Sequence, residues 1–88
     1  MARRDLDEHW AQLVAAVQKE FSRQGQDPAA VFVPDRDQLK LRARVDRPGE
    51  AAHWIVISVT PAQLNAFNVD GMAREFVALY QQERRQPS

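Results

Sequence analysis

The chain has 88 residues, with twelve basic and twelve acidic side chains and no cysteine. This length gives room for one domain, and the cancelling charges argue against a global electrostatic attraction to nucleic acid. The lack of cysteine excludes disulfides, thiolate catalysis and cysteine-based zinc sites within the sequence. No apolar run approaches the ~20 residues of a membrane span. We therefore expect one soluble cytoplasmic domain over residues 1–88, with flexible ends at about 1–4 and 83–88.

The first expected element is a helix of about five turns, because its apolar residues repeat at helical spacing. The residues on this stripe are Leu6, Trp10, Leu13, Val14, Val17 and Phe21. Asp5 is expected as the N-cap, with Glu8 three residues later. Gly25 is expected to close the helix in a left-handed conformation, and Pro28 prevents its continuation.

Three strands are expected next. A short run, Ala30–Val33, is rich in β-branched residues and is closed by Pro34. Residues 39–45 alternate between apolar and basic side chains, and residues 51–60 form a third strand with an apolar centre. A turn at residues 46–50 predicts a register in which Val45 faces Ala51 and Arg42 faces Trp54 across the hairpin. In that register Arg42 is placed for a cation–π contact with the indole.

The last third of the chain is expected to form two helical segments. Thr60 and Gln63 fit a capping box around Pro61 at the first helical position. The first segment buries Leu64 and Phe67, and a break or kink is expected around residues 68–71, where Asn, Asp and Gly occur. The second segment places four residues on one face: Met72, Phe76, Leu79 and Tyr80.

This order, α-β-β-β-α-α, predicts an α+β two-layer sandwich, in which a three-stranded antiparallel sheet has its helices packed on one face. The order resembles that of the double-stranded-RNA-binding domain. That family has a Lys-rich start to its last helix and a Gly-Pro-x-His hairpin. Here the corresponding segments read Thr60-Pro61-Ala62-Gln63-Leu64 and Pro34-Asp35-Arg36-Asp37. Because both motifs differ, the chain is not assigned to that family, and no other is recognised.

Catalytic and metal-binding signals are weak. The two histidines, His9 and His53, lack the spacing of zinc ligands. His9 is expected to be a solvated helix residue, and His53 is expected near the end of the sheet on its inner face. No serine lies in a G-x-S-x-G motif, and the scattered glycines form no phosphate-binding loop. We expect no enzyme activity, no cofactor, no metal and no small-molecule ligand.

The face of the sheet turned away from the helices carries the strongest functional pattern. Its candidate residues are Lys40, Arg42, Arg44, Trp54 and Val56. Bases could stack on Trp54 while the cations meet phosphates, which would make the chain a nucleic-acid-binding module. The alternative is a solvated face, in which the Arg stems cover the indole. The zero net charge favours the solvated face.

The leading functional hypothesis is a protein-interaction or homo-oligomerising module. In a meander the third strand lies at an edge, yet residues 54–57 are apolar on both faces and neither charge nor proline protects them. A second copy could cover this strand, or the outer face, in a homodimer with two-fold symmetry. The nucleic-acid-binding module using the basic and aromatic face remains the alternative hypothesis.

Overall fold

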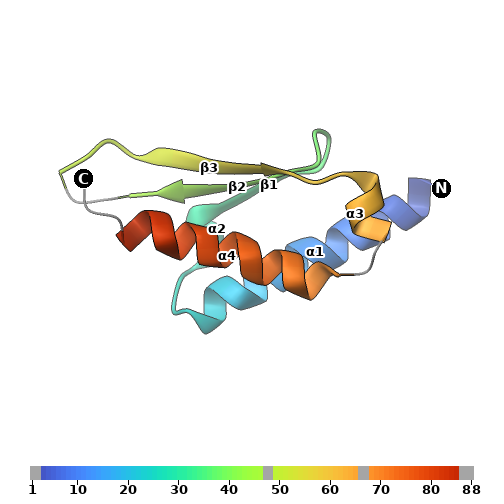
Figure 1. The fold of residues 1–88 in the computed structure, drawn as a ribbon, viewed down its shortest axis with the longest axis horizontal. Helices are drawn as coiled ribbons and strands as arrows, with labels where there is room; N and C mark the ends of the chain where they lie inside the picture. The colour runs from blue at the N-terminus through green and yellow to red at the C-terminus, as the bar shows by residue number, and fades with distance from the viewer. Residues whose placement is uncertain (1–2, 47–48, 66–67, 86–88) are drawn as a thin grey trace.

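A computed structural model describes residues 3–46, 49–65 and 68–85 (Figure 1). Within these ranges the chain forms four helices and three strands, in the order α1-α2-β1-β2-β3-α3-α4. Their bounds are Arg3–Arg23 for α1, Pro28–Val31 for α2, Phe32–Asp35 for β1, Lys40–Val45 for β2, His53–Ser58 for β3, Pro61–Asn65 for α3 and Val69–Arg85 for α4. None of the helices is long and apolar enough to cross a membrane, among the residues that were described.

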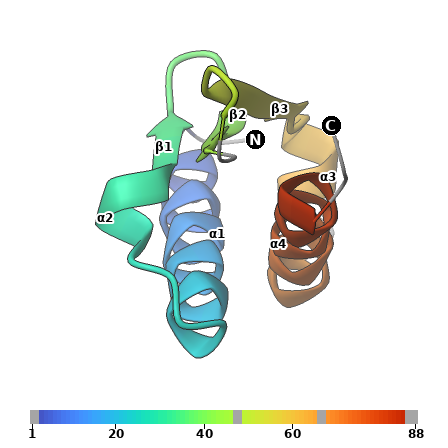
Figure 2. The ribbon, with the colours of Figure 1, turned by 90° about the vertical axis from the view of Figure 1, so that its left-hand side faces the viewer.

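The strands form one antiparallel sheet in the order β1-β2-β3, so β2 is central and β3 is an edge strand. The two long helices, α1 and α4, lie side by side beneath one face of this sheet (Figure 2). The expected α+β sandwich is therefore confirmed. Its other sheet face carries no helix in the part of the chain that is described (Figures 1 and 2).

The end of α1 is formed as the sequence predicts, whereas its start is not. Gly25 has a φ of +80° and follows the last turn. The Gln26 N–H donates to the Phe21 carbonyl at 2.9 Å, and the Gly25 N–H donates to the Ser22 carbonyl at 3.0 Å. This pair of bonds is a Schellman motif, which satisfies carbonyls at the helix end. The helix begins at Arg3, so the prediction of Asp5 as its N-cap was wrong.

The expected strand at Ala30–Val33 was also wrong, because a separate short helix, α2, occupies Pro28–Val31. The Asp27 carboxylate accepts a hydrogen bond from the Ala29 N–H at 3.0 Å, and Pro28 follows directly. An Asp N-cap before a proline favours a helix start at this position. The strand is therefore displaced to Phe32–Asp35, where Phe32 is buried and Val33 faces outward.

The hairpin of β2 and β3 has a register two residues away from the expected one. Val45 pairs with His53, Leu41 with Ile57, and Arg42 with Val56. Because side chains alternate with a period of two, this shift leaves every residue on its expected face. It also brings Val59 opposite Leu39, where the Val59 N–H donates to the Leu39 carbonyl at 2.8 Å. The connection between the strands is correspondingly longer than residues 46–50.

The capping box at the start of α3 is confirmed. The Gln63 N–H donates to the Thr60 hydroxyl oxygen at 3.1 Å, and the Thr60 N–H donates to the Gln63 side chain at 2.8 Å. Asn68 directly precedes α4. Its carbonyl accepts the first hydrogen bond of that helix, from the Met72 N–H at 3.0 Å. Asp70 and Gly71 therefore lie inside α4. The expected two helical segments are thus present, as α3 over Pro61–Asn65 and α4 from Val69 onward.

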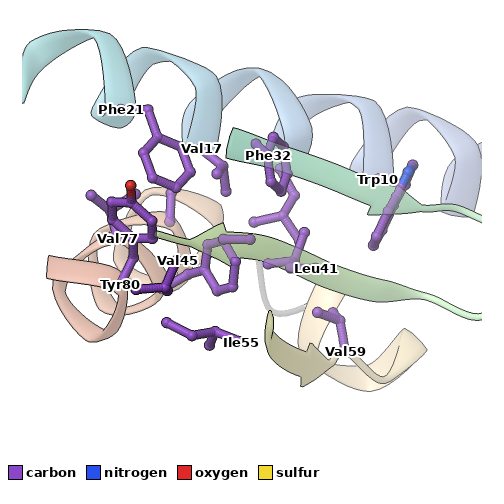
Figure 3. Packing of buried hydrophobic residues seen from close by; sticks show 14 of the residues in the cluster. Trp10, Val17, Phe21, Phe32, Leu41, Val45, Ile55, Val59, Val77 and Tyr80 are labelled. Atoms are coloured by element: carbon purple, nitrogen blue, oxygen red, sulfur yellow. The ribbon is translucent and has the colours of Figure 1, made fainter. Parts of the chain in front are cut away.

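The core fills the space between the sheet and the two long helices (Figure 3). The buried residues include seven from the apolar faces of the helices and strands: Trp10, Leu13, Val17, Leu41, Ile55, Leu64 and Phe76. Ile57 and Leu79 are only partly buried, and Phe67 lies outside the described residues. Phe21, near the end of α1, packs against α4, where its ring lies 5.1 Å from that of Tyr80 and 6.2 Å from that of Phe76.

Candidate interaction surface

The five predicted surface residues meet on the outer face of the sheet, the face turned away from α1 and α4. Register places them in rows across the strands: Val33, Arg42 and Val56 form one row, and Arg44 and Trp54 form the next. Lys40 lies between Asp35 and Ser58 in a third row. Each row therefore has one cation, carried by the central strand. We call the outward side chains of these rows the outer face: Val33, Lys40, Arg42, Arg44, Trp54 and Val56.

Exposed apolar side chains concentrate on the outer face. Among the described residues, the large hydrophobic side chains that are exposed are Trp54 at 51%, Val56 at 48% and Val33 at 38%. All three belong to the edge strands β1 and β3, on either side of the file of cations on β2. Sequence reasoning missed Val33, because the face of the first strand depends on where that strand begins. The Asp-Pro start of α2 was the signal that could have located it.

The outer-face cations have acidic neighbours that sequence reasoning did not include. The Arg44 Nε lies 3.2 Å from a carboxylate oxygen of Asp46, and the Arg42 guanidinium lies 3.9 Å from a carboxylate oxygen of Asp35. The Arg42 Nε also donates to the Val33 carbonyl at 3.4 Å. These exposed contacts are weak and easily exchanged. The predicted pairing of Arg42 with Trp54 was wrong, because Trp54 stands opposite Arg44.

The backbone of β3 is unpaired along its outer edge. Because the Val59 N–H donates to the Leu39 carbonyl, the alternation of an antiparallel pair means that Ile57, Ile55 and His53 make the other backbone bonds to β2. The N–H and C=O groups of Trp54, Val56 and Ser58 then point away from β2, toward the open edge. No charged residue and no proline occurs in β3. An edge of this kind is a template for a further strand.

The opposite edge of the sheet, formed by β1, is protected. Since β2 uses Leu41 and Ala43 for its bonds to β3, it uses Arg42 and Lys40 for its bonds to β1. Phe32 and Pro34 of β1 therefore direct their backbone groups outward. Pro34 has no N–H to offer there, which both protects the edge and leaves the ladder to β2 intact. One edge of the sheet is thus blocked by a proline and the other is open.

Beneath the open edge the core is incompletely covered. Ile57 on β3 and Met72 and Leu79 on α4 are apolar but only partly buried. A hollow of about 80 Å³ opens between Ile57, Val59, Met72 and Phe76, with Glu75 among its lining residues. The open backbone edge and this half-buried apolar layer lie at the same side of the domain.

The two histidines are placed by packing and not by a common site. His9 is buried at 9% exposure, so the expectation of a solvated residue was wrong. His53 is half-buried at the start of β3, as expected, and its Nε2 lies 3.6 Å from a carboxylate oxygen of Glu83 on α4. Within residues 3–46, 49–65 and 68–85, no group of three or more His, Asp or Glu side chains is gathered in a way that could hold a metal ion.

Comparison with other proteins gives no relative from which a function could be transferred. No protein-family model matches the chain, and neither the curated proteins nor the solved structures contain a match. The function is therefore argued from the open edge of β3 and from the outer face.

Proposed function

We propose that the protein is a small non-catalytic interaction module that forms a homodimer through the edge of β3. The observation that carries the proposal is the uncharged, unprotected backbone edge at Trp54, Val56 and Ser58. Such an edge pairs readily with another strand, and natural proteins usually block it. The half-buried apolar residues beneath it would gain cover from the same contact.

A second copy is the occupant that this strand fits best. Antiparallel pairing about a two-fold axis at Val56 sets Val56 against Val56 of the other copy, and Trp54 against Ser58. On the inner face the same register sets Ile55 against Ile57. The residues paired in this register are apolar, aromatic or hydroxylated, and β3 contains no Asp, Glu, Lys or Arg. Self-pairing therefore brings no like charges together, and two three-stranded sheets join into one of six strands.

The remaining expectations agree with this role. The proposed dimer contact uses a backbone edge and apolar side chains, so the proposal includes no catalysis. We also propose a cytoplasmic location, because the sequence contains no cysteine. The alternative from the sequence, a nucleic-acid-binding face, uses the outward side chains of β2 and β3 and not the backbone edge. Pairing through β3 leaves those side chains accessible.

The test substitutes the valine at the proposed two-fold axis. Val56→Lys places two ammonium groups opposite each other in the paired sheet, where like charges are destabilising. Light scattering coupled to size exclusion should give twice the chain mass for the native protein and the mass of one 10.1 kDa chain for the variant.

Val33→Lys is the matched control. Val33 and Val56 are both exposed valines that flank Arg42 in one row, but Val33 belongs to the proline-blocked edge. The control should keep the dimer mass. A native protein of single-chain mass at all concentrations would overturn the proposal, and so would a loss of the dimer in both variants, which would indicate pairing through the outer face instead.

A further inference from the structure

We propose that the outer face binds single-stranded nucleic acid, with the phosphates over β2 and the bases over β3. This inference goes beyond dimer formation and does not depend on it, because it uses side chains and not the edge of the sheet. The supporting observation is that the three outward cations of β2 form a file beside the half-exposed Trp54 of β3.

The geometry of β2 suits an extended phosphate backbone. Lys40, Arg42 and Arg44 occupy every second position of one straight strand. Neighbouring cations in this file are therefore about 7 Å apart at their Cα atoms, given a rise of ~3.4 Å per residue. Successive phosphates along one nucleic-acid strand have a comparable repeat, so the file can follow one phosphate backbone. The preference for a single strand comes from the exposed Trp54, because a base can stack on its ring only when it is not stacked inside a duplex.

The neighbouring strand supplies the surface for the bases. Trp54 stands directly opposite Arg44, one strand spacing of ~4.8 Å away. Its indole is 51% exposed, so a ring face can be covered by a base. Val56 stands opposite Arg42 and continues the apolar surface to the next row. Base stacking on an aromatic side chain beside a cationic track is how proteins bind single strands without sequence preference.

The acidic neighbours do not prevent binding, but they weaken it. Asp46 and Asp35 hold Arg44 and Arg42 through exposed contacts. The side chains of Arg44 and Asp46 are 53% and 65% exposed, so a phosphate can replace the carboxylate as the partner of the guanidinium. Removing the Asp46 charge should therefore strengthen binding, a direction that general damage to the fold would not produce.

Tryptophan fluorescence provides the assay, because the two tryptophans differ in exposure. Trp10 is buried at 6% and Trp54 is 51% exposed. An oligothymidylate of ~10 nucleotides should quench the native protein, and Trp54→Phe should abolish the quenching while leaving Trp10 emission unchanged. Arg44→Gln should weaken binding about tenfold at low salt and lower the salt slope by about one. Asp46→Asn should strengthen binding and should leave the oligomer mass measured by light scattering unchanged.

Two controls decide the class of ligand. A mixed-sequence duplex should compete poorly, and poly-glutamate should not quench Trp54. Quenching by poly-glutamate equal to that by the oligonucleotide would overturn the proposal in favour of an acidic protein partner. The absence of quenching at low salt, or quenching that Arg44→Gln and Asp46→Asn leave unchanged, would overturn it as well. Because Asp46→Asn is read by affinity and Val56→Lys by mass, failure of one proposal is distinguishable from failure of the other.

Discussion

Truncating Leu41 and its cross-strand neighbour Ile57 should have unequal effects on the free energy of unfolding. The two residues are paired on the inner face of β2 and β3. Leu41 belongs to the central strand and is 1% exposed, whereas Ile57 belongs to the edge strand and is only partly buried. Sequence patterning treats them alike, but the structure separates them.

The expected sizes follow from the atoms removed. Either change to alanine removes three carbons, worth ~2.4 kcal/mol at ~0.8 kcal/mol for each buried carbon. At Leu41 a cavity contribution is added, because the site borders an existing hollow between rigid elements, and the expected loss is ~3–5 kcal/mol. At Ile57 the side chain is only partly buried and its removal leaves no enclosed cavity, so the expected loss is smaller, about 1.5 kcal/mol. A domain of 88 residues has only ~4–13 kcal/mol of stability in total.

Urea unfolding followed by far-ultraviolet circular dichroism measures both values, at a protein concentration where light scattering shows single chains. The midpoint should fall sharply for Leu41→Ala and slightly for Ile57→Ala, with an unchanged slope against urea. Equal losses in the two variants would refute the placement of β3 at an edge. If the homodimer forms, the cost of Ile57→Ala should grow with protein concentration, because pairing buries this side chain.

Two further changes test local interactions. Thr60→Ala should cost ~1 kcal/mol by removing half of the capping box, and faster amide exchange at Gln63 should report it; unchanged exchange would show that the hydroxyl bond is not formed in solution. Burial raises the pKa of Tyr80 above 10.0, an effect that Asp46 adds to and Arg84 opposes. Its contribution to stability is therefore full below pH ~10 and is lost as the pH rises through the folded-state pKa. Since the chain has one tyrosine, its phenolate absorbance follows this residue directly. Native protein should lose stability relative to Tyr80→Phe as the pH rises above ~10, and parallel curves would contradict the burial.

Sequence alone determined the features that depend on neighbouring residues. The apolar stripe of α1, the Gly25 end of that helix and the Thr60–Gln63 capping box were all predicted, because spacing and cap chemistry act within a few residues. The alternation in β2 also assigned its basic residues to one face of the sheet. The order of elements then left one simple packing, with helices on the apolar face, and the residues of the outer face followed from it.

Tertiary structure decided the features that depend on position along a neighbouring strand or helix. Alternation fixes only which face a residue occupies, so it could not distinguish the observed register from one two residues away, and Arg44 instead of Arg42 came to stand opposite Trp54. The burial of His9 and the partial exposure of Ile57 were also decided by tertiary packing. The sequence predicted an unprotected edge at the third strand, but not which backbone groups of Pro34 and Val56 point away from β2, because that depends on the register of both hairpins. That direction is set only when both hairpins have closed.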